Sequence, residues 1–552
     1  MNTQMKTFNS NMYRMLFASC LSALCLIALS AQAATIMVMN TNDSAAGSLR
    51  QAIADAVDGD TINFDSSLNG QTVTLTSGEL LVDKNVIISG PGADMLAVDS
   101  SHSSRVFHIA SDKTVTISGL TITNGNGNFD IGAGGGIYND HATLTVNNCV
   151  VSGNVASIGG GIFNGSQFGG SATLTINNST ISGNSADGES GAGGGVGSSG
   201  AFGNATVTIN NSTISGNSAN YLTGLGGGIL NVSATLTINN STLSGNWTTG
   251  EFSNGGAISQ GDGSLTITNS TLSGNSTNGK GGAILNSGFS SSATLMLHNS
   301  TLSGNSASSG GAIYNNGQFN STSAHIGNTI LETGASGENI VNSSGTVTSD
   351  GYNLSSDNAG GLLTTTGDQI NADPLLGPLQ DNGGPTFTHA LLQGSPAIDA
   401  GDPNFTPPPD YDQRGADFPR VFNGRVDIGA FEIQTATPAY AGQVQPPINP
   451  DGSSTFNVRR GVVPVKFNLS QGGVATCDLP LATIAVTRTA GGVIGAVNES
   501  LYSGNADTGS NFRIDNCQYV YNLNARALGV GTYRVDILIA GQVVGNAVFG
   551  LN

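Results

Sequence analysis

The sequence predicts an all-β protein: a right-handed parallel β-helix with an N-terminal helical cap, followed by a small immunoglobulin-like β-sandwich. The phrase TLTINNSTISGN, at residues 173–184, recurs at steps of 29 to 33 residues through the middle of the chain. A second phrase, GGGIYN at 134–139, recurs between its copies. Two interleaved repeats with one period are typical of a solenoid, in which each repeat forms one coil.

Each repeat has the pattern of short strands separated by bends. In the segment 172–177, ATLTIN, leucine and isoleucine alternate with threonine, so one face is apolar and the other carries hydroxyl groups. Asn178 and Gly183 follow at positions where a bend needs a left-handed backbone, which asparagine and glycine tolerate. Helical repeats are excluded, because Gly, Asn, Thr and Ser occupy the positions where a helix requires Ala, Leu, Glu or Lys.

Composition changes mark the expected boundaries. Ser48 and Gln51 form a capping-box pattern ahead of a short amphipathic segment, which predicts the helical cap. After Asn315 the repeat decays into irregular chain, and from Thr435 alternating strands with turn signals predict the sandwich. The expected ranges are 34–434 for the β-helix (cap 34–64, coils 65–330, closing region 331–434) and 435–552 for the sandwich.

The first 33 residues have the pattern of a signal peptide. Lys6 and Arg14 precede an apolar run, which ends in the Ala-Gln-Ala cleavage pattern at Ala33. No later apolar run is long enough to cross a bilayer. We therefore expect a secreted protein, outside the cell or on a bacterial cell surface, in an oligomeric state that the sequence leaves open.

The charge of the chain excludes one class of partner. With a net charge of −19 and 10% charged residues, the chain lacks the clustered Lys and Arg that nucleic-acid phosphates require. We expect no nucleic-acid partner. A polysaccharide or another cell-surface ligand is the expected class.

Three cysteines follow the signal peptide. Cys477 and Cys517 lie in the sandwich and are expected to form a disulfide in an oxidising compartment. Cys149 stands where sibling repeats have Ser. It is either a reactive thiol or a small buried side chain, and we favour burial because free cysteines are usually buried.

One asparagine position recurs in successive repeats. Its amides are expected to stack along the solenoid and to hydrogen-bond from coil to coil as a structural ladder. The alternative is an N-glycosylation acceptor, because each lies in an N-S-T sequence. The residues are Asn178, Asn211, Asn240, Asn269 and Asn299.

The coils carry no recognisable catalytic set. Between Thr114 and Ile330 there is one lysine, Lys280, and no arginine, and the acidic residues do not recur at a shared position. His298 stands where siblings have Asn and is interpreted as a hydrogen-bonded turn residue rather than a ligand. We predict no catalytic residue, no metal site and no cofactor, with calcium as an unsupported option.

Charged residues do gather in the closing region. They could bind calcium or a uronate, but ion pairs that pin an irregular segment are the favoured interpretation. The cluster comprises Asp399, Asp412, Arg414, Arg420 and Asp427.

Several motifs resemble known families. NTNDSAAGSLRQAI at 40–53 resembles the cap of secreted bacterial β-helix proteins of the CSLREA type, and GGAI with SGN resembles the polymorphic outer-membrane protein repeat. The segment DPLLGPLQDNGGP at 373–385, with its continuation, is similar to the choice-of-anchor Q domain, and VPVKF at 463–467 resembles the PxKF domain. The resemblances imply an exported β-helix protein, and they imply no catalytic residues.

Together these observations predict a non-catalytic surface or matrix protein that adheres to carbohydrate or to a cell surface through its β-helix. The alternative is a polysaccharide-degrading lyase or hydrolase with its site in the closing region. A minor alternative is ice binding, because the pairs Thr143/Thr145, Thr173/Thr175, Thr206/Thr208 and Thr235/Thr237 would stack into a hydroxyl grid.

Overall fold

The computed structural model of the protein describes residues 33–552 except 129–131, 166–168, 189–190, 435–439, 450, 472–473, 478–480, 498–506, 508 and 540–541. All but the last residue of the expected signal peptide lies outside the described residues. The chain divides into two compact units, Met1–Gln434 and Thr435–Asn552. The predicted all-β class and the parallel β-helix are confirmed.

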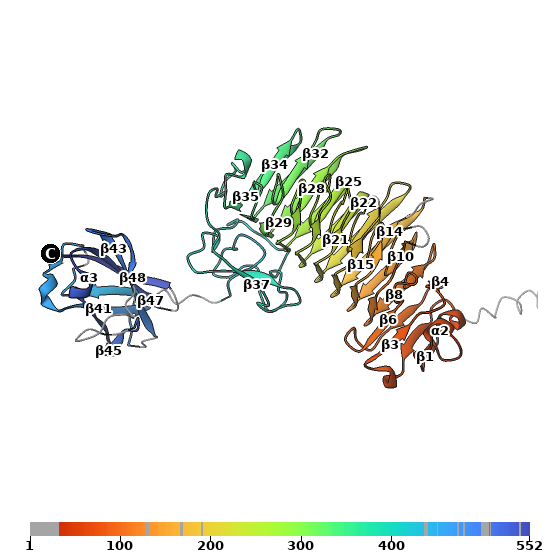
Figure 1. The fold of residues 1–552 in the computed structure, drawn as a ribbon, viewed down its shortest axis with the longest axis horizontal. Coiled ribbons are helices and arrows are strands. Elements are labelled where there is room, and N and C mark those ends of the chain that lie inside the picture. The colour runs from red at the N-terminus through yellow and green to blue at the C-terminus, as the bar shows by residue number, and fades with distance from the viewer. Residues whose placement is uncertain are drawn as a thin grey trace, which may run out of the picture. The chain divides into compact units, whose positions relative to one another are not determined.

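The first unit is a stack of coils, whose strands lie side by side in Figure 1. Each complete coil has an entry strand, which in the regular repeats follows a GGG or GGA bend, and a threonine strand, which in many coils contains the T-x-T pair. Both strands belong to one large sheet. The entry strands are β4 (Leu80–Val82), β7 (Phe107–Ile109), β10 (Ile137–Asp140), β14 (Ile162–Gly165), β18 (Val196–Ser199), β28 (Ile284–Ser287), β31 (Ile313–Asn316) and β34 (Ile340–Ser343). The threonine strands and their equivalents are β1 (Thr35–Val38), β2 (Thr61–Phe64), β5 (Ile87–Ser89), β8 (Thr114–Ser118), β11 (Thr143–Asn147), β15 (Ser171–Asn177), β19 (Asn204–Asn210), β29 (Ala293–His298), β32 (Thr322–Gly327) and β35 (Thr346–Gly351). In β22 (Ile229–Asn239) and β25 (Ile258–Thr268) the two strands are continuous.

Two smaller parallel sheets complete the coils. The second sheet contains β3 (Gln71–Thr74), β6 (Leu96–Asp99), β9 (Thr121–Thr123), β12 (Val150–Ser152), β16 (Thr180–Ser182), β20 (Thr213–Ser215), β23 (Thr242–Ser244), β26 (Thr271–Ser273), β30 (Thr301–Asn305), β33 (Ile330–Thr333) and β36 (Leu354–Ser355). The third contains β13 (Val155–Ala156), β17 (Ser185–Ala186), β21 (Ser218–Ala219), β24 (Trp247–Thr248) and β27 (Ser276–Thr277).

The alternation of apolar residues and threonine in the sequence produces the core. In β15, Leu174 and Ile176 are fully buried, whereas Thr173 and Thr175 on the other face are partly exposed. The strands are in register, so Thr173 pairs with Thr206 of the next coil. The threonines therefore form two columns on the outer face, as the ice-binding alternative requires, and that alternative remains a prediction.

Two amide ladders run along the coils. Each side-chain amide of the inner ladder is at most 1% exposed, and its Nδ2 donates to Oδ1 of the next member at 2.9–3.0 Å. The outer ladder lies at the end of the threonine strands, with Nδ2–Oδ1 distances of 2.8–3.0 Å. The inner ladder is Asn154, Asn184, Asn217, Asn246, Asn275 and Asn305, and the outer ladder is Asn147, Asn177, Asn210 and Asn239.

The asparagines predicted as the ladder, Asn178, Asn211, Asn240, Asn269 and Asn299, occupy the adjoining bend. All five have a left-handed backbone, with φ between 47° and 55°. Asn269 donates to Asn240 at 2.7 Å, and Asn299 accepts from Asn328 at 2.9 Å. This position therefore serves mainly to turn the chain, and the continuous ladders lie one residue earlier and six residues later.

The cap and the closing region bound the coils. Helix α2 (Leu49–Asp55) begins after Ser48, whose side chain accepts from the Gln51 backbone, and it packs Leu49 and Ile53 into the core. Beyond the last coil, β37 (Leu376–Gln380) and β38 (Thr388–Leu391) form an antiparallel hairpin (Figure 1). The short 3-10 helices are Ser66–Leu68, Ala359–Gly361 and Val458–Arg460.

The closing region runs back along the second sheet, a placement that the sequence did not indicate. The Thr242 hydroxyl donates to the Phe387 carbonyl at 2.6 Å, and the Thr271 hydroxyl donates to Gln413 at 2.6 Å. These threonines are buried, whereas Thr213, at the same position in an earlier coil, remains partly exposed. The closing region therefore covers the later coils and leaves the earlier ones open.

The second unit is a β-sandwich of two five-stranded sheets. Its core contains aromatic side chains, among them Phe467 and Tyr519, which stack at 4.3 Å between ring centroids. The disulfide Cys477–Cys517 lies here. Its elements are β39 (Tyr440–Gln445), β40 (Thr455–Phe456), β41 (Val462–Gln471), β42 (Val474–Ala475), β43 (Ala482–Ala490), β44 (Gly495–Val497), β45 (Arg513–Asp515), β46 (Gln518–Asn524), α3 (Ala525–Leu528), β47 (Gly531–Ile539) and β48 (Gln542–Leu551).

Cys149 lies in the β-helix core, 1% exposed, and burial raises the pKa of its thiol to about 11. A thiol with a raised pKa is protonated at neutral pH and is a poor nucleophile. The favoured interpretation of a buried, unreactive cysteine agrees with this environment.

The inner ladder predicts a large effect of a single amide. We expect Asn217→Ala to lower the free energy of unfolding by about 3 kcal/mol, because several buried partners of Asn217 would lose their hydrogen bonds. Urea unfolding followed by circular dichroism measures the change. The control Asn204→Ala removes an exposed asparagine from β19, and equal unfolding midpoints for the two variants would contradict the ladder's importance.

Candidate functional site

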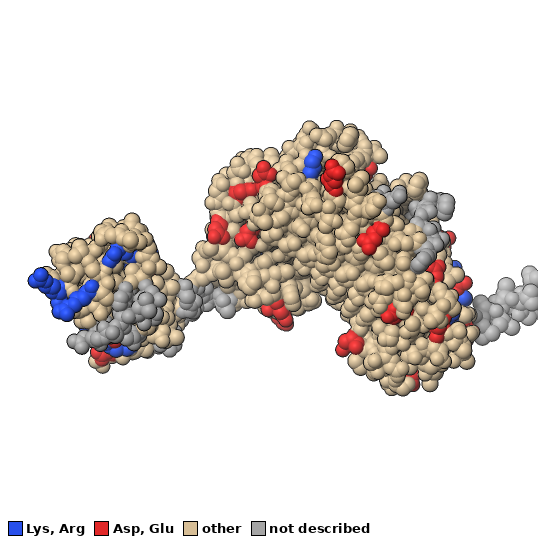
Figure 2. Space-filling view, viewed as in Figure 1, with Lys and Arg blue, Asp and Glu red and all other residues tan. Residues whose placement is uncertain are grey.

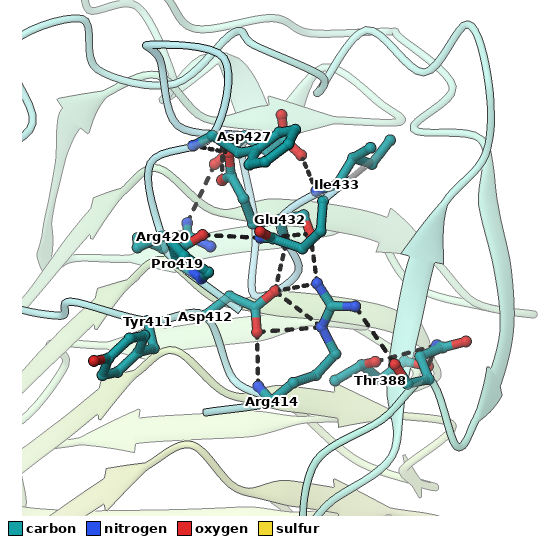
Figure 3. A network of polar contacts seen from close by, with 12 residues as sticks. Thr388, Tyr411, Asp412, Arg414, Pro419, Arg420, Asp427, Glu432 and Ile433 are labelled. Atoms are coloured by element: carbon teal, nitrogen blue, oxygen red, sulfur yellow. Dashed lines mark hydrogen bonds and ion pairs between the residues drawn. The ribbon is translucent and has the colours of Figure 1, made fainter. Parts of the chain in front are cut away.

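The charged cluster of the closing region is buried. Figure 3 shows its side chains turned toward one another. Arg414 donates to Asp412 at 2.6 Å, and its guanidinium lies 3.8 Å from the ring centroids of both Phe418 and Phe431. Asp412 is 0% exposed and Arg414 is 7% exposed, so neither charge can contact a polymer in solution.

The remaining members of the cluster bind the backbone of the closing region. Arg420 is 0% exposed and donates to the Gly429 carbonyl at 2.6 Å. Asp427 accepts from the backbone N–H groups of Asp399 and Ile433, each at 2.7 Å. Asp399 is the exposed member. The cluster therefore pins irregular chain, and it is not an accessible site for the alternative function.

A long polar groove follows the bend between the threonine strands and the second sheet. It has a volume of about 1000 Å³. We call it the amide groove because its lining is mostly carboxamide: Asn147, Asn148, Asn177, Asn178, Asn210, Asn211, Asn239, Asn240, Thr268, His298 and Asn299, with Pro408 and Pro409 of the closing region.

The amide groove has the dimensions of an extended polymer site. Its lining residues occupy six consecutive coils, from Asn147 to His298, which corresponds to about 24 Å at the strand spacing of a parallel sheet. A carboxamide has two N–H donors and two acceptor sites. The outer ladder uses one side-chain N–H of Asn177, Asn210 and Asn239, so each of these amides keeps a second N–H for a ligand.

His298 lies at the C-terminal end of the amide groove, where the groove meets a second hollow of about 250 Å³. Its Nε2 is 2.9 Å from Oδ2 of Asp350, and Nδ1 of His325 is 3.4 Å from the other oxygen of that carboxylate. The three side chains are 34–44% exposed. This is an accessible histidine–carboxylate arrangement of the kind that transfers protons in catalysis.

Glycine at position 327 makes room for this pair. A Cβ there would lie 3.0 Å from Cδ2 of His298 and 3.2 Å from Cβ of Asp350. Gly327 also lies opposite His298 in the register of β29 and β32. A side chain at position 327 would therefore press against the imidazole of His298.

His298 departs visibly from the repeat in the sequence, whereas its partners do not follow from any local pattern. His325 and Asp350 lie in the next two coils, on β32 and β35. His325 pairs with Met296 of the preceding coil and Thr348 of the next, and Asp350 is the extra residue of a bulge in β35. Ionisable residues in three consecutive coils were the signal that could have found the site.

A second set of ionisable residues gathers on the first entry strands. Arg105 donates to Glu79 at 2.5 Å, and His108 lies 3.0 Å from the same carboxylate. His141 lies 2.5 Å from Asp140. Arg105 is 2% exposed and also donates to the Gly134 carbonyl at 2.9 Å, so this set holds neighbouring coils together.

The rest of the surface offers little charge chemistry. Figure 2 shows acidic side chains scattered singly over the face of the β-helix that it presents. Among the described residues, no group of three or more His, Cys, Asp or Glu is arranged to hold a metal ion. No helix in the described part of the chain has the length and apolar character needed to cross a membrane.

Two solved structures resemble the chain. Pectate lyase Pel9A matches with 15% identity and a TM-score of 0.42, over 73% of this chain and 97% of the lyase chain. The PL6 family alginate lyase AlyGC matches with 14% identity and a TM-score of 0.31, over 77% of this chain and 61% of that chain. No protein-family model and no curated protein matches. The CSLREA, polymorphic outer-membrane protein, choice-of-anchor and PxKF resemblances therefore remain predictions.

These comparisons correct one expectation. The two matches contradict the prediction that the chain is not an enzyme, because both are structures of polysaccharide lyases. Identities of 14–15% leave the chemistry of this chain to be argued from its own side chains.

The buried cluster predicts a fall in stability as pH rises. Burial, with the neighbouring Asp427, raises the pKa of Glu432 to about 8, and burial raises the pKa of Asp427 to about 6. In the unfolded chain both groups release their protons near pH 4, so the folded state binds more protons above that pH. The stabilisation is fully present below about pH 4 and is lost as pH rises through 6 and 8.

Thermal unfolding between pH 5 and pH 9 measures this dependence. We expect the melting temperature of the wild type to fall over this range, and Glu432→Gln to flatten the upper part of the decline. The control Glu251→Gln, at an exposed loop, should keep the wild-type slope. An unchanged slope in Glu432→Gln would contradict the assignment.

Proposed function

We propose that the protein is a polysaccharide-degrading enzyme that binds an extended acidic glycan in the amide groove and cleaves it by β-elimination. The observation that carries the proposal is the pairing of His298 with Asp350 at the end of the groove, at 2.9 Å. No other hollow described in the chain combines an exposed histidine–carboxylate pair with a polymer-length lining.

The lining suits a sugar chain. Successive coils present carboxamides at about 4.8 Å intervals, which is close to the length of one pyranose unit in an extended chain. Carboxamides can donate to hydroxyl or carboxylate oxygens and can accept from hydroxyl groups. Pro408 and Pro409 of the closing region form a side wall of the groove at the later coils.

Elimination uses the groups at the end of the groove. His298 takes the proton from the carbon next to the uronate carboxylate, and Asp350 stabilises the imidazolium that forms. The side-chain N–H groups of Asn299, which also lines the groove, can donate to the carboxylate as negative charge develops there. The bond between the neighbouring carbon and the glycosidic oxygen breaks, that oxygen takes a proton from the imidazolium, and the products are an unsaturated uronate and a new reducing end.

We also propose that the protein works outside the cell. The signal-peptide pattern of residues 1–33 and the Cys477–Cys517 disulfide support an exported protein, because disulfides persist in oxidising compartments. A polysaccharide that is too large to enter the cell has to be cleaved outside it.

The repeat supplies a mild variant to test His298. His298→Asn restores the residue that sibling coils have at this position, so we expect the fold to persist and the rate to fall by roughly 10²- to 10⁴-fold. The assay follows ultraviolet absorbance of unsaturated products from polygalacturonate and alginate.

The matched control is His102→Asn, which makes the same substitution at an exposed histidine with a left-handed backbone that does not line the groove. It should keep the activity of the wild type. Reducing ends without unsaturated products would show hydrolysis instead of elimination. Full activity in His298→Asn would exclude His298 as the proton-transfer group.

A further inference from the structure

Three exposed phenylalanines border a hollow on the outer face of the entry strands β28 and β31. Phe252, Phe289 and Phe319 are 59%, 53% and 67% exposed. They line a hollow of about 410 Å³, and its charged lining residues are Lys280 and Glu251. Asn316 also lines it. We call this hollow the aromatic trough. It shares no lining residue with the amide groove.

The loops that carry these rings are anchored to the β-helix. Asp262, 3% exposed, accepts hydrogen bonds from the backbone N–H groups of Phe289, Ser290 and Ser291 at 2.7–3.2 Å. Asn320 of the next coil donates to the Phe289 carbonyl at 2.8 Å. A buried carboxylate thus holds a loop whose aromatic ring faces solvent, an arrangement that does not serve the core.

The polar groups of the trough are also prepared for a ligand. Lys280, the one lysine between Thr114 and Ile330, lies with Nζ 4.7 Å from the ring centroid of Tyr314. Asn316 is 9% exposed, and its Oδ1 has no hydrogen-bond partner among the described residues. A buried acceptor without a partner is costly unless a ligand or water satisfies it.

We propose that the aromatic trough is a second carbohydrate-binding site, which holds an acidic glycan apart from the amide groove. Phe289 and Phe319 stack with their centroids 6.1 Å apart and an interplanar angle of 24°, and thus present neighbouring rings to the apolar faces of two sugar units. Asn316 Oδ1 accepts from a sugar hydroxyl. The Lys280 ammonium pairs with a carboxylate, and it is a rare positive charge on an acidic chain.

The two sites lie at opposite ends of one strand. Phe289 is in the loop that precedes β29 (Ala293–His298), and His298 is its last residue. Six residues of strand span roughly 20 Å. A polymer held in the trough is therefore kept near the groove. That this polymer is also the substrate of the groove rests on the proposed function. Glycan binding at the trough does not depend on that function.

Affinity gel electrophoresis of the full chain in polygalacturonate, alginate and neutral dextran tests the site. All proteins carry His298→Asn, so binding is measured without cleavage. We expect Phe289→Ala with Phe319→Ala to weaken binding to all three glycans by about tenfold or more. Lys280→Gln should weaken binding to the two uronates alone, and added salt should reduce that difference.

Phe202→Ala is the matched control, because Phe202 is 67% exposed in the equivalent loop of an earlier coil but does not line the trough. It should bind as the parent does. Parent-like binding by the Phe289/Phe319 variant, or no binding by the parent, would overturn the proposal. The proposal would also be overturned if sedimentation showed that the His298→Asn parent self-associates through these rings and if removing the rings left glycan binding unchanged. In a Phe289→Ala/Phe319→Ala variant that retains His298, normal cleavage of short oligosaccharides together with lost trough binding would separate this site from the groove.

Discussion

The in-register stacking of identical short strands is the constraint on which the rest of the structure depends. Because successive coils carry the same residue at the same position, each amide of the inner ladder finds another amide within reach, as Asn184 finds Asn217 at 3.0 Å. The interior can therefore include fully buried amides without leaving them unpaired. The same repetition places like residues in columns on the surface, which makes a long uniform groove from a single residue position.

Function enters where the repetition is broken. Asn becomes His at position 298, and the next two coils add His325, two positions earlier along its strand, and Asp350, at a bulge. These three departures from the repeat form the histidine–carboxylate arrangement. On the entry strands, inserted loops bring Phe289 and Phe319 to the surface in the same way. A rigid scaffold with local exceptions holds such groups in place, because the neighbouring coils fix the backbone around each of them.

The period-2 pattern of segments such as ATLTIN was enough to predict strands, coil register and the buried Leu174 and Ile176, because local alternation decides which face is buried. The bend asparagines were predicted as a ladder, yet the ladders use Asn177 and Asn184, since a single residue of offset decides which amides face each other. His298 was interpreted as a turn residue because its partner Asp350 lies 52 positions away. The backward path of the closing region could not be predicted either, because it depends on contacts such as Thr242 with Gln413, for which no local pattern exists.

The position of the closing region sets the order in which the groove can be completed. Its floor is built coil by coil from residues close in sequence, and such local contacts form early. Its wall at Pro408 and Pro409 comes from chain far beyond the coils it covers, with contacts that span up to 171 positions. A chain that emerges from a membrane amino end first would thus present an open amide face, and a walled groove only after its first unit is complete. Under the proposed function and location, cleavage would begin only after the first unit has folded outside the membrane.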